Sequence, residues 1–135
     1  MSRLNLTKEQ AAGIAGVIMS ESGLNPKAYN SREKAGKLKG SRANGAGYGA
    51  GMLQWSNERK NSVLELIGKK GVNIETLPLE DQIEMIAREL EGPYKNTLAG
   101  IRASRTASES AATMYCHNVA GFSRSSNPAT QQEID

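Results

Sequence analysis

The chain has 135 residues and a formal net charge of +3, with a single cysteine, a single histidine and a single tryptophan. This length fits one domain, and no apolar run is long enough to be a membrane-spanning segment or the hydrophobic part of a signal peptide, so we expect no membrane insertion. Because Cys116 has no partner cysteine and His117 is the only imidazole, we expect no internal disulfide, no metal site and no other cofactor.

The first predicted element is a helix that ends in an acidic residue. Thr7 and Gln10 have the spacing of a capping box, and apolar residues then repeat at helical intervals up to Glu21. Gly23 and Pro26 follow, so the helix is expected to end directly after Glu21. Apolar neighbours and the negative end of the helix dipole would both disfavour the charged carboxylate there, and a neutral carboxyl can donate a proton. The alternative is a solvated acid at a frayed helix end.

The segment from Asn25 to Ser56 has no helical period and is rich in basic residues, glycine and serine. It predicts a long loop that ends in a small β-element, and a loop of this length inside a compact domain is commonly functional. Tyr48, Gln54 and Trp55 lie among glycines near its end, a pattern that favours a tight hairpin or loop bringing backbone close to a ligand. Trp55 is equally compatible with a position in the core.

This loop also carries most of the excess positive charge. It has one acid, Glu33, against six cations within residues 27–42, which are Lys27, Arg32, Lys34, Lys37, Lys39 and Arg42. Such a stretch is either a solvated loop or a surface for a polyanion, for which nucleic acid and the bacterial cell wall are the two candidates. Tyr29 is the only aromatic residue among these charges, so we expect no nucleic acid partner.

Four further helices are predicted after the loop. The first is capped by Ser56 or Asn57 and ends near Gly71, and the second lies between Pro78 and Gly92. Their apolar positions have helical spacing and are expected to face inward: Val63, Leu64 and Ile67 in the first, and Leu79, Ile83, Ile86 and Leu90 in the second.

The last two helices complete the predicted domain. A short helix contains Tyr94, Leu98 and Ile101, and a second capping box, at residues 106–109, opens a segment that ends at Gly121. That segment is expected to bury Ala112, Met114, Tyr115 and Val119. We therefore predict a mainly α-helical domain over residues 1–121, followed over residues 122–135 by a polar tail or a lead into further chain.

Two sequence motifs resemble those of a known family. Glu21-Ser22, followed after a loop by Gly51-Met52-Leu53-Gln54, is similar to the Glu-Ser and Gly-Leu-Met-Gln motifs of goose-type lysozymes and lytic transglycosylases. The longer runs at residues 21–26, 47–49 and 54–55 more closely resemble phage tail lysozymes. The resemblance implies a mainly α, lysozyme-like fold with a small β-hairpin beside the catalytic helix. It also implies cleavage of peptidoglycan between N-acetylmuramic acid and N-acetylglucosamine.

The same resemblance implies roles for individual residues. Glu21 would be the catalytic general acid, Ser22 and Gln54 would position the glycan, and Tyr48 and Trp55 would complete the substrate-binding set by shaping the cleft floor. The bacterial peptidoglycan strand is then the main partner, with other phage tail proteins as further partners. The protein would be located in the phage virion tail, or in the host cytoplasm before release, and would act on the cell wall.

The reaction type stays open at this point. Retaining glycosidases use a second carboxylate about 5–5.5 Å from the first. No acid lies between Lys34 and Asn57, and Glu33 and Glu58 are the nearest ones in sequence. Hydrolysis is the favoured outcome, and the alternative is a lytic transglycosylase that produces anhydromuramyl ends. From other classes, the alternatives are a non-catalytic glycan-binding or structural tail domain and a nucleic-acid-binding domain.

Overall fold

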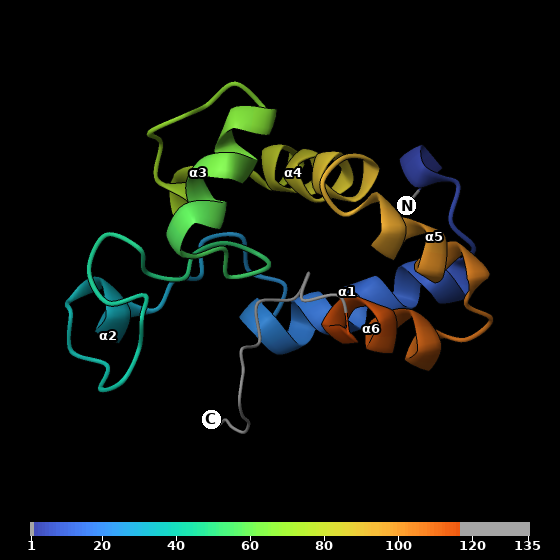
Figure 1. Cartoon of the computed structure of the whole chain (residues 1–135), viewed down its shortest axis with the longest axis horizontal. Coiled ribbons are helices and arrows are strands. Elements are labelled where there is room, and N and C mark those ends of the chain that lie inside the picture. The colour runs from blue at the N-terminus through green and yellow to red at the C-terminus, as the bar shows by residue number, and fades with distance from the viewer. Residues whose placement is uncertain (1, 117–135) are drawn as a thin grey trace.

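A computed structural model of the chain describes residues 2–116 and is mainly α-helical, as expected. Helix α1 packs against α6, α6 against α5, α5 against α4, and α4 against α3 (Figure 1). Two short 3₁₀ helices and six α-helices occur in this range: η1 (Ser2–Leu4), α1 (Lys8–Ser22), α2 (Ser31–Lys34), α3 (Asn57–Leu66), η2 (Ile74–Thr76), α4 (Leu79–Glu91), α5 (Lys95–Ala103) and α6 (Ala107–Cys116). None of these helices is long and apolar enough to cross a membrane.

Both ends of α1 are fixed by the predicted local signals. The Thr7 hydroxyl accepts a hydrogen bond from the Gln10 backbone N–H at 3.1 Å, and the Gln10 side chain accepts one from the Thr7 N–H at 3.0 Å. At the other end, Gly23 has a φ of 66° and donates its N–H to the Met19 carbonyl at 2.8 Å. The capping box and the glycine end are therefore confirmed, and they place Glu21 in the last turn.

The long loop contains more structure than the sequence predicted. A four-residue helix, α2, begins after Asn30, whose side chain accepts a hydrogen bond from the Glu33 N–H at 3.0 Å. In the described part of the chain the β-element consists of two isolated bridges, Tyr29 to Ala50 and Ala50 to Trp55. The second bridge closes a tight turn over residues 50–55, which is the small hairpin element that the pattern of glycines predicted.

Helix α4 exists as predicted, but its inward face differs from the expected one. Leu79 and Ile83 are 44% and 40% exposed, whereas Gln82 and Glu89 are 0% and 2% exposed. The prediction of Leu79 and Ile83 as core residues is therefore wrong, while Ile86 and Leu90 are buried as expected. The helix is turned so that two polar side chains reach partners inside the protein, because a buried amide or carboxylate is stable only when it is hydrogen-bonded.

Gln82 connects three segments that are distant in sequence. Its side-chain oxygen accepts a hydrogen bond from the Met52 N–H at 2.8 Å. Its amide nitrogen donates to the Pro26 carbonyl at 2.7 Å and to the Ile74 carbonyl at 3.0 Å. The segment after α1, the tight turn and η2 are thus held to α4 by one side chain.

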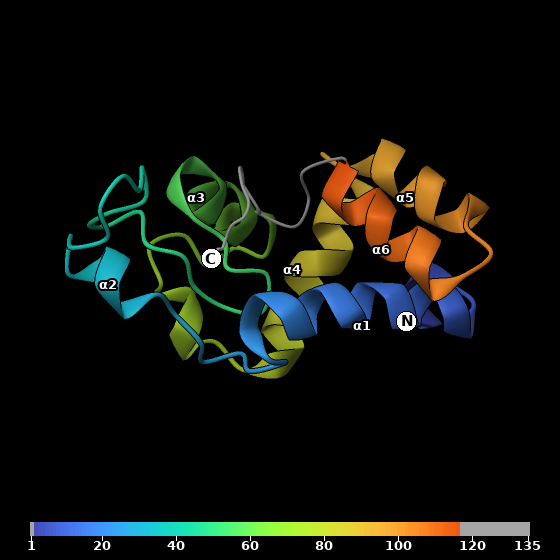
Figure 2. The same cartoon turned by 90° about the horizontal axis from the view of Figure 1, so that it is seen from below.

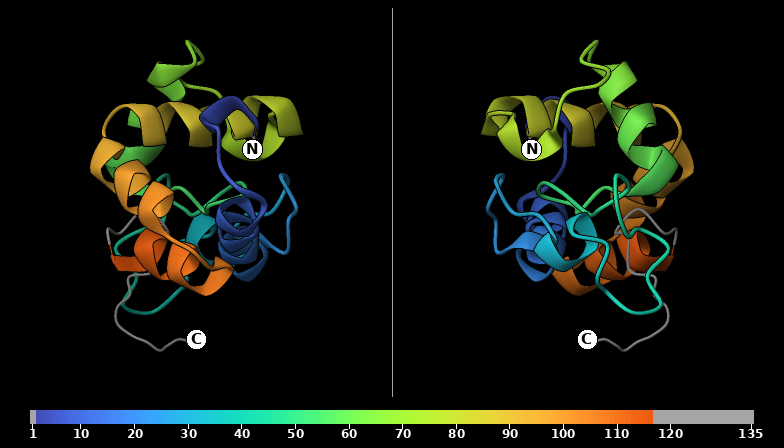
Figure 3. Two further views of the ribbon diagram at one scale, coloured as in Figure 1. Left: turned by 90° about the vertical axis from the view of Figure 1, so that its right-hand side faces the viewer. Right: turned by 90° about the vertical axis from the view of Figure 1, so that its left-hand side faces the viewer.

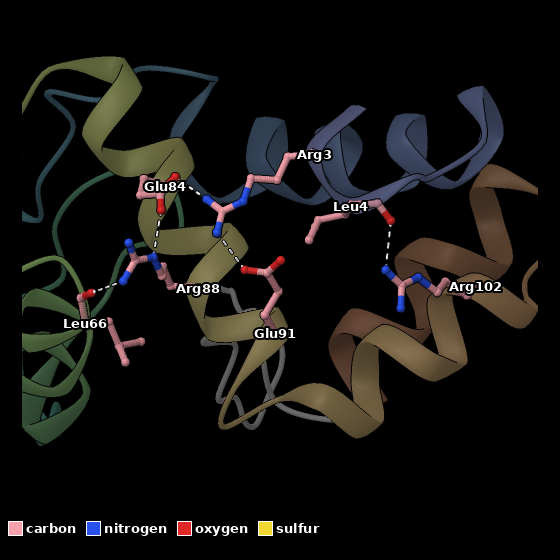
Figure 4. Close-up of polar contacts among 7 residues, drawn as sticks. All are labelled: Arg3, Leu4, Leu66, Glu84, Arg88, Glu91 and Arg102. Carbon is pink, nitrogen blue, oxygen red and sulfur yellow. Dashed lines mark hydrogen bonds and ion pairs between the residues drawn. The ribbon is translucent and has the colours of Figure 1, made fainter.

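The exposed side of α4 carries an ion-pair network (Figure 4). The Arg3 guanidinium is hydrogen-bonded to Glu84, and Arg88 Nε lies 2.7 Å from the same carboxylate. Arg102 of α5 donates to the Leu4 carbonyl at 2.9 Å. Exposed pairs contribute little free energy, so we assign this network the role of holding the N-terminal segment in place beside α4 and α5.

The two last helices follow the predicted order. The Thr106 hydroxyl caps α6 by accepting from the Glu109 N–H at 3.1 Å, and the Glu109 carboxylate accepts from the Arg105 N–H at 2.7 Å. Met114 is buried, whereas Ala112 is exposed, so the expected burial of Ala112 is wrong. Val119, Gly121, the boundary at residue 121 and the tail at 122–135 lie outside the described residues and stay predictions.

Candidate active site

The candidate acid lies at the end of a buried helical stripe. Ile14 and Ile18 of α1 are 2% and 6% exposed, and Glu21 follows on the same side of the helix and is half-buried. Gly23 and Leu24 both have positive φ, at 66° and 64°. Two consecutive left-handed residues turn the backbone sharply after the helix, so the carboxyl group lies at a helix end that the chain leaves at once.

A buried ion pair connects three elements of the site. The Arg59 guanidinium of α3 donates hydrogen bonds to both carboxylate oxygens of Glu89 on α4. Nε lies 2.8 Å from Oε2, and Nη2 lies 2.6 Å from Oε1. The Trp55 indole N–H donates to Glu89 Oε1 at 3.0 Å. The guanidinium also lies over the Tyr94 ring, 5.0 Å from its centroid. This arrangement fixes the Arg59 side chain in one position.

Arg59 also interacts electrostatically with Glu21. Burial by itself would lower the pKa of Arg59, but the hydrogen bonds and charge of Glu89, with further contributions from Tyr94 and Glu21, raise it overall. Arg59 is therefore a permanent cation within electrostatic range of Glu21. A cation beside a carboxyl stabilises its ionised form, which opposes the effect of the apolar stripe and of the helix end.

Ser22 and Gln54, which were predicted to position the glycan, both form hydrogen bonds with backbone carbonyls of the protein. The Ser22 hydroxyl donates to the Ile18 carbonyl at 3.0 Å, inside α1. The Gln54 amide nitrogen donates to the Gly51 carbonyl at 2.9 Å and to the Ala28 carbonyl at 3.2 Å. Both residues are half-buried, and their contact with a glycan stays a prediction.

Tyr48 and Trp55 lie beneath the surface. The two residues are 5% and 1% exposed, which fits rings that lie under a surface, and their predicted role in shaping the floor of a glycan cleft stays a prediction. The Tyr48 hydroxyl donates to Glu75, and the Trp55 N–H donates to Glu89. A buried phenol or indole is stable only with such a partner, so these two rings support the loop from below.

The two acids that the sequence left as candidates for a second carboxylate both have structural partners. Glu33 accepts hydrogen bonds from the Ser41 hydroxyl at 2.5 Å and from the Gly49 N–H at 2.9 Å. Glu58 is exposed and pairs with Arg42 at 3.2 Å. Glu33 is therefore engaged inside the loop, whereas Glu58 points into solvent in an exposed pair with Arg42. Within residues 2–116, no three histidine, cysteine or acidic side chains are grouped so that they could hold a metal ion.

Sequence reasoning missed Arg59, Gln82 and Glu89. A weak signal for two of them was present: Gln82, Ile86 and Glu89 have the same four-three spacing as the apolar positions of α4, so they share one helix face. Polar residues on such a face normally indicate solvent, and only their partners in other elements reveal that they are buried.

These features define the class of the protein. A mainly helical domain with a half-buried glutamate in the last turn of a helix, followed by a loop and a glycine-rich turn, is lysozyme-like. The family model for phage tail lysozyme matches residues 1–134, and the chain belongs to this family. Neither a curated protein nor a solved structure gives a significant match. Membership makes this a phage-associated, lysozyme-like enzyme whose substrate is the peptidoglycan of the cell wall.

Proposed function

We propose that the protein is a muramidase that hydrolyses the bond between N-acetylmuramic acid and N-acetylglucosamine, with Glu21 as the general acid. The observation that supports this role is the position of Glu21: it ends the buried stripe of α1 and interacts with the fixed cation Arg59. Proton donation to the glycosidic oxygen leaves a carboxylate on Glu21. Arg59 stabilises that negative charge as it forms, while the apolar stripe and the helix end favour the neutral acid that must be present before the step.

A mechanism with a single carboxylate agrees with the hydrogen bonding of the other acids. Glu33 is hydrogen-bonded inside the loop, Glu58 is exposed to solvent beside Arg42, and Glu89 is 2% exposed and bound by Arg59. A covalent glycosyl-enzyme needs an accessible second carboxylate. We therefore expect either attack by a water molecule or assistance by the acetamido group of the substrate, and we favour hydrolysis because the chain belongs to the tail lysozymes.

Analysis of the products distinguishes hydrolysis from transglycosylation. We expect muropeptides released from purified walls to end in a reducing N-acetylmuramic acid, which borohydride converts to the alcohol and mass spectrometry detects. A digest made up of unreduced anhydromuramyl ends would show that the enzyme is a lytic transglycosylase. Walls that release no muropeptides at all would favour the non-catalytic alternative.

The first prediction concerns Glu21 itself. The variant Glu21→Gln should lose at least about 100-fold in muropeptide release, because the amide has nearly the same shape but cannot donate an acid proton. Circular dichroism and thermal unfolding should match the wild type. Glu9→Gln is the matched control, since it makes the same exchange at an exposed position of the same helix and should keep full activity. Retained activity in Glu21→Gln, with normal folding, would remove Glu21 from the mechanism.

We further propose that the protein acts from the phage tail, in contact with other tail proteins. Family membership supports a phage-associated location, and the finer location is open to a direct test. Purified virions should contain the chain in a fixed copy number by quantitative mass spectrometry. Its presence only in lysates of infected cells, and not in virions, would instead favour release from the host cytoplasm.

A further inference from the structure

The loop around α2 presents positive charges that the rest of the fold does not use. We call residues 27–42 the cationic lobe. Two of its cations are paired, Lys34 with Glu75 at 3.5 Å and Arg42 with Glu58 at 3.2 Å. The other four are exposed and form no ion pair with any residue in the described range: Lys27, Arg32, Lys37 and Lys39.

The only acid of the lobe has an internal role. Glu33 is half-buried and accepts hydrogen bonds from the Ser41 hydroxyl at 2.5 Å and from the Gly49 N–H at 2.9 Å. Its backbone carbonyl also accepts from the Gly45 N–H at 2.6 Å. Glu33 is the single acid against the six cations of residues 27–42, so the lobe keeps a large excess of positive charge.

The lobe is an ordered structure rather than an extended loop. Asn44 bonds both backbone groups of Leu38, accepting from its N–H at 3.1 Å and donating to its carbonyl at 2.8 Å. The Lys37 N–H donates to the Arg32 carbonyl at 2.8 Å. The cations are therefore carried on a folded backbone at one end of the molecule, opposite the end formed by α5 (Figure 1). An ordered array of like charges loses less entropy when it binds a charged surface than a flexible loop does.

We propose that the cationic lobe binds the carboxylate groups of the peptides attached to the peptidoglycan glycan and so holds the enzyme on the wall. Peptidoglycan is the substrate class of the family, and its peptides supply repeated negative charges beside the strand that is cleaved. Four exposed cations that form no ion pair within residues 2–116 match such a repeated, low-specificity charge pattern. The proposal rests on the wall as the target but not on Glu21 as the acid.

A nucleic acid is the other polyanion class, and the lobe is poorly suited to it. Single-stranded nucleic acids need aromatic rings on which bases stack. The one exposed ring of the lobe, Tyr29, is already covered by Lys34, whose Nζ lies 4.9 Å from the ring centroid, and it contacts the Tyr48 ring edge-on at 6.0 Å. The lobe therefore offers one partly exposed ring among six cations, and not the series of rings on which successive bases stack.

The test compares two triple charge reversals that change the net charge equally. One variant carries Arg32→Glu, Lys37→Glu and Lys39→Glu in the lobe. The control carries Lys8→Glu, Lys95→Glu and Arg105→Glu, three exposed positions at or next to helix N-termini, where an acid is favourable. Binding is measured on ice by sedimentation with purified walls freed of nucleic acid and of phosphate-containing polymers. All proteins carry Glu21→Gln, and muropeptide release is recorded from the same tubes.

We expect the lobe variant to bind roughly tenfold more weakly than the control at about 0.05 M salt, and the difference to vanish near 1 M salt, where charges are screened within about 3 Å. Walls whose carboxylates have been amidated should bind all proteins equally weakly. If the charge reversal unfolds the lobe, a neutral variant with Arg32→Gln, Lys37→Gln and Lys39→Gln replaces it in the binding measurement. This variant should also bind walls more weakly than the control at low salt, by a smaller factor.

Several results would overturn the proposal. Equal losses in the lobe and control variants would show an effect of net charge alone. Binding that needs the phosphate-containing polymers, or binding to duplex DNA that is tighter than binding to stripped walls, would assign the lobe a different partner. Muropeptide release that persists in Glu21→Gln would contradict the proposed acid while leaving the binding comparison valid.

Discussion

The side chain of Gln54 stabilises the turn between Gly51 and Trp55. Gln54 itself has a positive φ of 52°, and its amide donates to the Gly51 and Ala28 carbonyls. We predict that Gln54→Ala lowers the free energy of unfolding by about 1–2 kcal/mol, because both hydrogen bonds are lost. Urea denaturation measures this loss. An unchanged stability with a large loss of muropeptide release would instead show that Gln54 acts mainly through the glycan.

The carboxylate of Glu75 makes stability depend on pH. Its side chain is 9% exposed, and burial alone would raise its pKa, but the hydrogen bond from Tyr48 and the nearby Lys34 lower the pKa overall from its usual 4.5. A group whose pKa is lower in the folded state stabilises the fold above its unfolded pKa. That stabilisation is lost as the pH falls through the folded pKa.

We therefore predict a shallower acid unfolding curve for Glu75→Gln. The amide still accepts the Tyr48 hydroxyl hydrogen bond but does not titrate. Between about pH 5 and pH 3, the wild type should lose more of its unfolding free energy than the variant does. Urea denaturation at several pH values measures both curves. Parallel curves would mean that Glu75 is not among the groups that set the acid stability.

At the scale of elements, the tight turn over residues 50–55 depends on one glycine for two reasons. Gly51 has a φ of 81°, and a Cβ at this position would lie 2.6 Å from a methyl carbon of Ile74 and 2.9 Å from the side-chain oxygen of Gln82. Gly36 also has a positive φ, of 73°, but no atom lies within 4 Å of its virtual Cβ. An alanine at Gly36 would therefore suffer backbone strain alone, whereas an alanine at Gly51 would suffer backbone strain and steric overlap.

We predict that Gly51→Ala destabilises the protein more than Gly36→Ala does. A left-handed backbone costs an alanine about 1–2 kcal/mol at either position. Gly51→Ala adds overpacking of about 1–3 kcal/mol, because Ile74 and Gln82 are buried and have little room to move. Chemical denaturation of both variants measures the difference. Equal losses would mean that the contacts of the turn with η2 and α4 relax without cost.

At the scale of the whole molecule, α1 and α6 bring the two ends of the described chain together. The two helices lie side by side (Figure 2), and the view along α1 shows α4 on one side of it and α6 on another (Figure 3). The Ser110 hydroxyl donates to the Gln10 carbonyl at 2.8 Å, and Gln10 in turn donates to the Arg102 and Ser104 carbonyls. The helix that carries Glu21 is therefore held by α6 and by the end of α5.

Alanine substitutions at two glycines of α1 are expected to change the stability of the fold in opposite directions. A Cβ on Gly13 would lie 2.4 Å from the Ala107 carbonyl oxygen and 2.6 Å from Ser110 Cβ, whereas Gly16 has no atom within 4 Å. Gly13→Ala should therefore destabilise the fold by about 1–3 kcal/mol by forcing α1 and α6 apart. Gly16→Ala should stabilise it by about 0.5–1 kcal/mol through helix propensity. Denaturation curves decide the sign, and a stabilising Gly13→Ala would contradict the close contact.

Much of the fold could be predicted from the sequence because its signals are local. The capping box at Thr7, the glycine after Ser22 and the spacing of apolar residues concern neighbours within one helix, and hydrogen bonds between such neighbours need no partner from a distant part of the chain. The same local signals placed Glu21 at the end of α1. The family resemblance of the motifs around Glu21 and Gln54 was also present in the sequence alone and is confirmed by the family match.

The tertiary structure decided which polar groups lie inside and what they bind. Gln82 and Glu89 share a face with Ile86, and no local rule distinguishes a solvated polar residue from one that meets Met52 or Arg59 after folding. Their burial depends on partners that are distant in the chain. Glu89 binds Arg59, which is 30 residues away, and Gln82 binds the carbonyl of Pro26, which is 56 residues away. Hydrogen-bond partners at such separations are fixed only when the elements pack, because the free energy of burying a polar group depends on the partner it finds there.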